Sequence, residues 1–216
     1  MPAFVGNDAS LGAIAEHIFG AGIGVTDLVY LNGGASGIGG GVIANGALLR
    51  GVGGYAGEFG QNRPGVRDHD DRISIDGTLE VEVSRSRLVK AVGLDAPDED
   101  ELAVALATGK DTAVRSELER QSRVLAVALS NAVNVLNPEV IVLGGFLAAL
   151  YAFDPRHLAA LVREQSVVAT VENVRIVPAA LGADLLVIGA GQLVFASLIA
   201  DPALRARYAW RSAYLP

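Results

Sequence analysis

The chain has 216 residues, of which 51% are hydrophobic, and it carries a formal net charge of −7. A negative surface repels nucleic-acid phosphates, so the composition argues against DNA binding by this chain alone. The absence of cysteine rules out disulfides and thiolate metal sites, and it fits a cytoplasmic protein. No uninterrupted apolar run reaches about 18 residues, and we therefore predict no contact with a membrane.

The first half of the chain predicts one helix and three short strands. Apolar residues at helical spacing predict a helix over residues 10–20. Apolar runs predict strands over residues 28–31, 39–43 and 47–49. The Asn45-Gly46 pair between the last two strands predicts a tight hairpin turn. A charged cluster around His69 is typical of a solvated loop, with a metal site as the alternative.

The second half predicts mainly helices, separated by two strands. Helical patterns cover, in chain order, residues 81–92, 96–108, 111–135, 155–165 and 184–198. Apolar runs rich in β-branched residues predict strands over residues 139–143 and 174–177. Helices that alternate with short buried strands indicate an α/β fold, with antiparallel pairing at the hairpin.

The segment Gly33–Gly41 contains six glycines and follows directly on the first predicted strand. Glycine this dense indicates that the backbone turns tightly or approaches another group closely. Two interpretations stay open from the residues alone. The segment is either a phosphate-binding loop, in which backbone N–H groups surround an anion, or a hairpin that uses glycine only for its conformation.

Four segments occur in an order that is typical of one family: Gly6–Ala9, Gly37–Ile43, Gly53–Gly60 and Asn137–Gly145. Together they resemble the ROK family of repressors and sugar kinases, and the resemblance covers nearly the whole chain. It implies an actin-like, ribonuclease-H-like ATPase fold with a mixed sheet flanked by helices. Residues 1–216 would form its C-terminal lobe, as one sugar-sensing or kinase-like domain. The N-terminal lobe, and any winged helix-turn-helix, would precede Met1.

The resemblance also implies a set of sugar-binding residues. In the family kinases, the position of Asp8 holds the general base that takes the proton from the attacking sugar hydroxyl. The positions of Asn7, Glu58, Gln61 and Glu80 contact the sugar. From the residues alone, Asn7 and Asp8 could instead cap the following helix, and Glu58 could be an ordinary surface residue. The resemblance favours sugar contact.

A zinc site of the family is lost from this sequence. Gln61 stands at the position of the family's histidine ligand, and the three cysteine ligands would fall at Asp71, Ile73 and Thr78. These residues cannot rebuild a tetrahedron of thiolates and imidazole. We therefore expect no metal site and no resident cofactor. The loop over residues 61–77 is expected to be either ordered by other contacts or mobile.

The glycine-rich segment and the Gly144-Gly145 pair correspond to the ATP site of the family. The residues implied for ATP binding are Ser36, Gly37, Gly39, Gly144 and Gly145. Active kinases of the family usually have Gly-Thr-Gly where this chain has Ala35-Ser36-Gly37. The methyl group of Ala35 stands where the backbone would approach phosphate, which argues against nucleotide binding. ATP and Mg²⁺ are expected only if the chain is part of a kinase.

Two functions follow from the resemblance, and a third stays open. The altered phosphate loop and the lost zinc site favour the effector-binding domain of a ROK-type transcriptional regulator of carbohydrate metabolism. It would bind a sugar or sugar phosphate, and would contact DNA only through an N-terminal domain outside this chain. The alternative is an ATP-dependent sugar kinase of the hexokinase or glucokinase type, with Asp8 as general base. A protein that acts only through association is the third. We expect a homodimer or a larger homo-oligomer.

Overall fold

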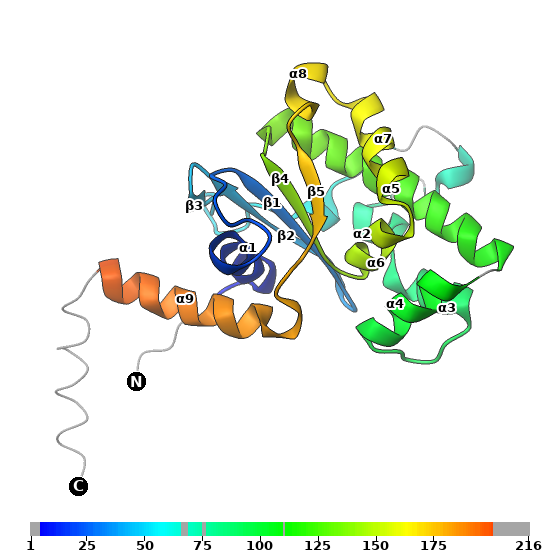
Figure 1. The fold of residues 1–216 in the computed structure, drawn as a ribbon, viewed down its shortest axis with the longest axis horizontal. Helices are drawn as coiled ribbons and strands as arrows, with labels where there is room; N and C mark the ends of the chain where they lie inside the picture. Colours follow the sequence, from blue (N-terminus) through cyan, green and yellow to red (C-terminus); the bar gives the residue numbers. More distant parts are fainter. Residues whose placement is uncertain (1–4, 66–68, 75–76, 110, 201–216) are drawn as a thin grey trace, which may run out of the picture.

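The computed structural model describes residues 5–65, 69–74, 77–109 and 111–200. In these residues a five-stranded sheet, in the order β3-β2-β1-β4-β5, lies between two layers of helices (Figure 1). The first two strands pair in antiparallel fashion, whereas the fourth and fifth continue parallel to the first. The strands are β1 (Leu28–Gly34), β2 (Gly37–Ala44), β3 (Ala47–Leu48), β4 (Val140–Gly145) and β5 (Arg175–Pro178).

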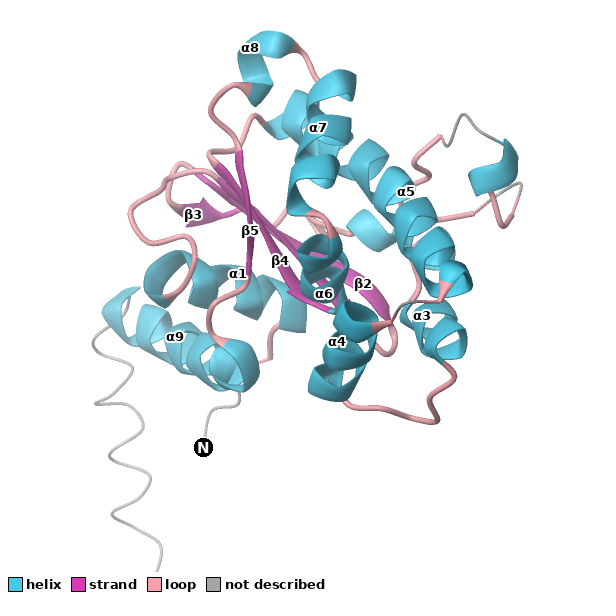
Figure 2. Ribbon diagram, turned by 45° about the vertical axis from the view of Figure 1, so that its right-hand side comes forward, coloured by secondary structure: helices cyan, strands magenta, loops and turns pink. Residues whose placement is uncertain are grey.

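The helices are divided unequally between the two faces of the sheet (Figure 2). One face is covered by α1 (Asp8–Phe19) and α9 (Leu185–Ala200). The other face carries α5 (Thr112–Leu136), with α6 (Phe146–Phe153) and α7 (Pro155–Gln165) beside it. The remaining elements are α2 (Leu79–Glu82), α3 (Arg85–Val92), α4 (Glu99–Thr108), α8 (Val168–Val171) and the 3₁₀ turns η1 (Phe59–Gln61), η2 (His69–Asp71) and η3 (Gly182–Asp184).

Successive residues of the central strands enter two separate hydrophobic cores. In β1, Leu28 and Tyr30 join the core beneath α1, while Val29 and Leu31 join the larger core beneath α5. Strand β4 repeats the pattern and is buried on both faces. This alternation follows from the two-residue period of a strand. The predicted α/β class, with its antiparallel hairpin, is therefore confirmed.

Several element boundaries coincide with signals that are visible in the sequence. Asp98 and Glu101 form a reciprocal capping box at the start of α4, and the Asp111 carboxylate caps α5. Asn45 and Gly46 both have positive φ, at 51° and 74°, as a two-residue hairpin turn requires. Pro155 occupies the first turn of α7, where a missing N–H costs nothing.

The prediction of a single helix over residues 81–92 is wrong. The segment forms two helices, α2 and α3, with extended backbone at Val83 and Ser84 between them. The side-chain amide of Gln121, on α5, accepts a hydrogen bond from the Ser84 N–H and donates one to the Ser84 carbonyl, each at 3.1 Å. The Ser84 N–H thus bonds to a side chain distant in sequence, while the Ser84 carbonyl oxygen also accepts the Leu88 N–H at 3.4 Å, at the start of α3.

Among the described residues, one segment is long and apolar enough to cross a membrane by length and composition alone, and it joins η3 to the apolar helix α9. The span Gly182–Ala200 has a mean hydropathy of 1.9, and only 6% of its most apolar window is buried. Gly189 and Gln192 interrupt its apolar run, so a search for uninterrupted runs misses it. Its backbone packs closely on α1, because a side chain at Gly189 would lie 2.4 Å from the Leu11 carbonyl oxygen. In this fold α9 lies against α1 at Gly189, and its other residues are half-buried or exposed.

Candidate functional site

A cavity of about 140 Å³, here called the main cavity, opens at the carboxyl end of β1, between the β1–β2 hairpin and the start of α1. Ligand sites in open α/β sheets are commonly found at this edge. Five of the residues predicted to form the site come together here. Among the described residues, the cavity is lined by Asp8, Ala9, Asn32, Gly34, Ser36, Gly37, Ile38, Gly39 and Glu80.

The glycines of β2 allow α1 to lie directly on the sheet. A Cβ atom at Gly41 would lie 2.6 Å from the Ala13 Cβ and 3.0 Å from the Ala9 carbonyl oxygen, and one at Gly39 would lie 2.9 Å from the Ala9 Cβ. On the opposite face, a Cβ atom at Gly40 would lie 2.5 Å from the Gly57 carbonyl oxygen. Packing against a helix and a loop therefore accounts for these glycines, and it sets the position of Asp8.

Asn7 and Asp8, at the start of α1, have different roles. The Asn7 amide oxygen accepts a hydrogen bond from the Ser10 N–H at 3.0 Å and thereby caps the helix, while Asp8 lines the main cavity. Glu58 is exposed in the turn before η1 and does not line the cavity. The structure thus brings Asp8 to the cavity, and leaves Asn7 and Glu58 outside its lining.

Glu80 is held in place by two contacts from separate elements. Its carboxylate accepts a 2.6 Å hydrogen bond from the side-chain amide of Gln61 and a 3.3 Å hydrogen bond from the Ile38 N–H of β2. The close approach also requires glycine at position 37, since a Cβ there would lie 2.2 Å from the Glu80 carboxylate. Gln61 therefore reaches the site through Glu80.

Asn32 is a cavity residue that the sequence reasoning missed. The Tyr30 hydroxyl donates a 3.2 Å hydrogen bond to the Asn32 amide oxygen, which leaves the amide N–H₂ group to face a ligand. Burial raises the pKa of the Tyr30 hydroxyl well above its usual value, and the Glu16 and Asp8 carboxylates raise it further. The hydroxyl therefore stays protonated and remains a donor. Tyr30 lies two residues before Asn32 in β1, so their side chains point to the same face of the strand. This spacing is the sequence signal that could have identified Asn32.

The comparison with known families decides the classification. The model of the ROK family matches residues 1–197.

The chain belongs to the ROK family.

Its relatives in this family include both regulators and enzymes. The chain is 25% identical over 218 residues to a xylose repressor of Caldicellulosiruptor bescii, covering 94% of this chain and 54% of the repressor. It is 31% identical over 165 residues to a glucokinase of Halalkalibacterium halodurans, covering 67% of this chain and 49% of the glucokinase. The chain thus spans about half the length of these curated relatives.

A solved structure shares the fold. A ROK family transcriptional regulator, described as a homologue of the E. coli MLC protein, superposes with a TM-score of 0.71 at 25% identity. The match covers 89% of this chain and 52% of that structure. The actin-like ATPase fold of ROK sugar kinases, predicted from the resemblance, is confirmed.

The residues at the family's ATP positions lie at the edge of the sheet that holds the main cavity. Gly144 and Gly145 end β4 in parallel register with Asn32 and Gly33 of β1. A second cavity, of about 220 Å³, lies beyond the hairpin tip and Glu80, lined in part by Ser36, Gly37, Ser84, Arg85, Ser86 and Phe146. Arg85 donates hydrogen bonds to the Glu99 carboxylate, at 2.8 Å, and to the Pro97 carbonyl oxygen. Its charge is thus balanced within the protein.

The residues at the family's zinc positions do not fit zinc. The Asp71 carboxylate receives two hydrogen bonds from Arg123, at 2.7 and 2.8 Å, while Gln61 is bound to Glu80. Ile73 carries no donor atom for a metal. Among the described residues, no group of three histidine, cysteine, aspartate or glutamate side chains could hold a metal ion. The side chain of His69 lies outside the described part.

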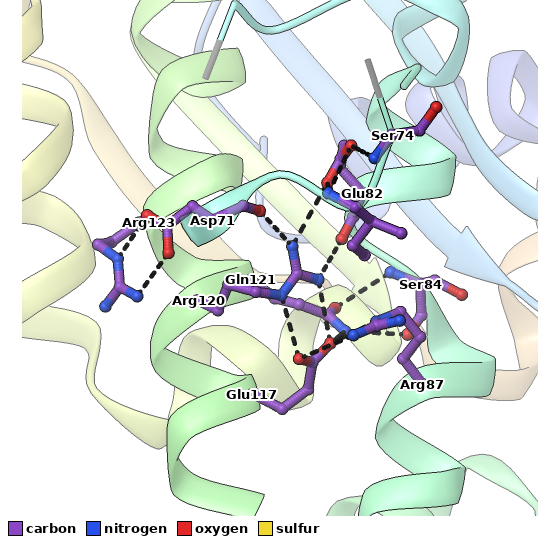
Figure 3. A network of polar contacts seen from close by, with 10 residues as sticks. Asp71, Ser74, Glu82, Ser84, Arg87, Glu117, Arg120, Gln121 and Arg123 are labelled. Atoms are coloured by element: carbon purple, nitrogen blue, oxygen red, sulfur yellow. Dashed lines mark hydrogen bonds and ion pairs between the residues drawn. The ribbon is translucent and has the colours of Figure 1, made fainter. Parts of the chain in front are cut away.

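A polar network centred on Arg120 occupies this region instead (Figure 3). In the described part of the loop over residues 61–77, Asp71 contacts Arg120 and Arg123, and the N–H groups of Ile73 and Ser74 donate to the Glu82 carboxylate.

Proposed function

We propose that this chain is the effector-binding part of a ROK-type transcriptional regulator of carbohydrate metabolism, and that a neutral sugar binds in the main cavity. The observation that carries the proposal is the meeting of two carboxylates, Asp8 and Glu80, with the amide of Asn32 around one small cavity. Carboxylates accept hydrogen bonds from hydroxyl groups, and the amide N–H₂ group donates them. A polyhydroxy compound matches this set of groups.

The charge of the cavity favours an unphosphorylated sugar over a sugar phosphate. Asp8 and Glu80 are the charged residues among the described residues that line the cavity, and both are acidic. A phosphate group beside two carboxylates would be repelled, since no lining cation offsets the charge in the described part. Asn7, Glu58 and Gln61 are kept as further sugar contacts on the strength of the family pattern.

Two observations favour a regulator over a kinase. Side chains at Ala35 and Ser36 occupy the hairpin tip where family kinases usually have Gly-Thr, and the glycines of β2 are explained by helix packing. In addition, relatives that cover most of this chain include a xylose repressor and an MLC homologue. The kinase alternative is favoured by Asp8, which stands at the position of the general base and lines the cavity. In that case alone, ATP would bind near Ser36, Gly37, Gly39, Gly144 and Gly145.

The remaining parts of the proposal concern the whole protein. DNA would be contacted by a domain outside these 216 residues, in keeping with the net charge of −7. The protein would act in the cytoplasm as a homodimer or a larger homo-oligomer. Sugar binding would require neither zinc nor ATP.

Isothermal titration calorimetry with D-xylose, D-glucose and glucose 6-phosphate tests the proposal. At least one neutral sugar is expected to bind, and glucose 6-phosphate is not. Asp8→Asn and Glu80→Gln each remove a charged acceptor, which should weaken binding by about tenfold or more. Glu164→Gln, at an exposed position of α7, is the matched control and should have no effect. Binding heat that is absent for both neutral sugars, or unchanged in both cavity variants, contradicts the proposal.

A further inference from the structure

We infer that Arg120 is a positioning residue for the sugar site: its guanidinium group fixes α2, and so Glu80, in the region where the ROK family pattern has zinc. The inference rests on the proposed function, because it concerns the carboxylate that is proposed to bind the sugar. It is carried by the contacts around α2, which are drawn in Figure 3.

Arg120 uses three guanidinium nitrogens to join three parts of the chain. Its Nη1 donates to the Asp71 carbonyl oxygen at 2.8 Å and contacts the Glu82 carboxylate at 3.4 Å. Its Nη2 donates to the Glu82 carbonyl oxygen, at the end of α2. Its Nε and Nη2 each donate to the Glu117 carboxylate at 3.0 Å. A planar group with five N–H donors can serve these directions at once, whereas a lysine ammonium cannot.

The Glu82 carboxylate extends the network into the loop. It accepts hydrogen bonds from the Ile73 N–H at 2.9 Å and from the Ser74 N–H at 3.0 Å, and its side chain is only 2% exposed. Asp71 and Ile73 stand at two of the three positions where the family pattern has cysteine. Hydrogen bonds to the backbone thus hold the loop at Asp71 and Ile73, where the family pattern has side chains that bind a metal.

The charges and polar atoms of the network are matched. Arg87, Arg120 and Arg123 pair with the carboxylates of Asp71, Glu82 and Glu117. Among the described residues, no buried side-chain nitrogen or oxygen lacks a partner. Such a network is rigid when every group is satisfied, and loss of one member leaves buried charge uncompensated.

Glu80 lies between two fixed ends of the same short helix. At the start of α2, the N–H of the fully buried Leu79 donates to the Asn62 carbonyl oxygen at 2.7 Å. At its end, Arg120 holds the Glu82 carbonyl oxygen, and Gln121 holds the next turn at Ser84. Release of the second end would let α2 shift, and the contact of Glu80 with the Ile38 N–H would be lost with it.

The test compares Arg120→Met with Arg115→Met, an exposed arginine on the same helix whose side chain is 69% exposed. Calorimetry uses D-xylose or D-glucose, whichever the wild type binds. Arg120→Met should weaken binding by about tenfold in the wild-type background but less than twofold when Glu80→Gln is already present. Arg115→Met should change neither value. An equal loss of affinity in both backgrounds means a general structural role and overturns the inference.

Hydrogen exchange gives a second readout that needs no sugar. In Arg120→Met, amide exchange should rise at Ile73, at Ser74 and through α2, while the amides of α7 keep their protection. Glu82→Gln, which nearly preserves shape, should give the same pattern in case Arg120→Met fails to fold. Unchanged exchange at these amides in both variants overturns the inference.

Two further controls separate this inference from its premises. Treatment of the wild type with a zinc chelator should change neither affinity nor exchange by more than twofold, and a loss that zinc restores overturns the inference. A wild type that binds no sugar overturns the proposed function, and with it the role of Arg120 in sugar binding.

Discussion

Replacing Gly41 with alanine should destabilise the protein, because α1 rests on the bare backbone of β2. The new Cβ would lie 2.6 Å from the Ala13 Cβ and 3.0 Å from the Ala9 carbonyl oxygen. Carbon atoms in contact normally lie about 3.5–4.0 Å apart, so the helix would have to move outward by about 1 Å. Overpacking of this kind costs about 1–3 kcal/mol, and rigid helix atoms place this site at the upper end.

The lower entropy of alanine in the unfolded chain offsets about 0.5–1 kcal/mol of that cost. The net loss is therefore about 2 kcal/mol, which corresponds to a melting temperature about 4–8 °C lower for a chain of this length. Urea unfolding followed by circular dichroism gives the free energy of unfolding, and a thermal scan gives the melting temperature.

Gly34→Ala is the matched control in the same hairpin. A Cβ at Gly34 would meet nothing within 4 Å, and its φ lies outside the left-handed region. This variant should stay within about 0.5 kcal/mol of the wild type or gain slightly. If Gly41→Ala and Gly34→Ala have the same stability, the glycines of β2 do not serve helix packing, and the phosphate-loop interpretation gains weight.

Three further predictions follow from the structure. Burial by itself raises the pKa of the Glu117 carboxyl, but hydrogen bonds from Arg120 and Arg87 outweigh it and lower that pKa from 4.5 to about 2. The stability that Glu117 contributes should therefore be present above pH 4.5 and be lost as the pH falls towards 2. Across this window, the midpoint of urea unfolding should depend less on pH in Glu117→Gln than in the wild type. An equal dependence on pH in the two proteins would refute the lowered pKa of Glu117. Asp98→Ala removes the capping box with Glu101 and should cost about 1 kcal/mol of unfolding free energy, while a loss below about 0.3 kcal/mol would mean that the box is not formed in solution. Incubated with ATP, Mg²⁺ and either D-glucose or D-xylose, the chain should form no sugar phosphate, and turnover detected by chromatography would favour the kinase alternative.

Local signals in the sequence were sufficient for most of the helices and strands. Caps such as Asp98 and Asp111, and the Asn45-Gly46 turn, act between residues a few positions apart, so the sequence displays them directly. The break between α2 and α3 could not be predicted in this way. It involves Gln121, which lies 37 residues beyond Ser84 and accepts a hydrogen bond from the Ser84 N–H. Periodicity contains no information about such a partner.

The difference between local and long-range signals also explains why one residue of the candidate site was predicted and another was missed. Asp8 was predictable, since it stands at the start of a predicted helix and belongs to a family motif. Asn32 was missed because it adjoins a glycine-rich segment, for which a phosphate-binding loop was one interpretation. Its role follows only from the alternation that brings Tyr30 and Asn32 to one face and from the cavity that Asn32 lines.

The two carboxylates of the site are fixed by different physical means, and this difference decides what a change in the chain can do to each. The position of Asp8 depends on the close contact between α1 and the glycines of β2. This contact involves no charge, and a larger side chain at one of these glycines would disturb it. Glu80 depends on α2, whose end is held by the guanidinium group of Arg120, so it responds to the loss of a charge or a donor. A variant that moves one carboxylate should therefore leave the other in place. Because a sugar with several hydroxyl groups would contact both, either loss alone should weaken binding without unfolding the opposite side of the cavity.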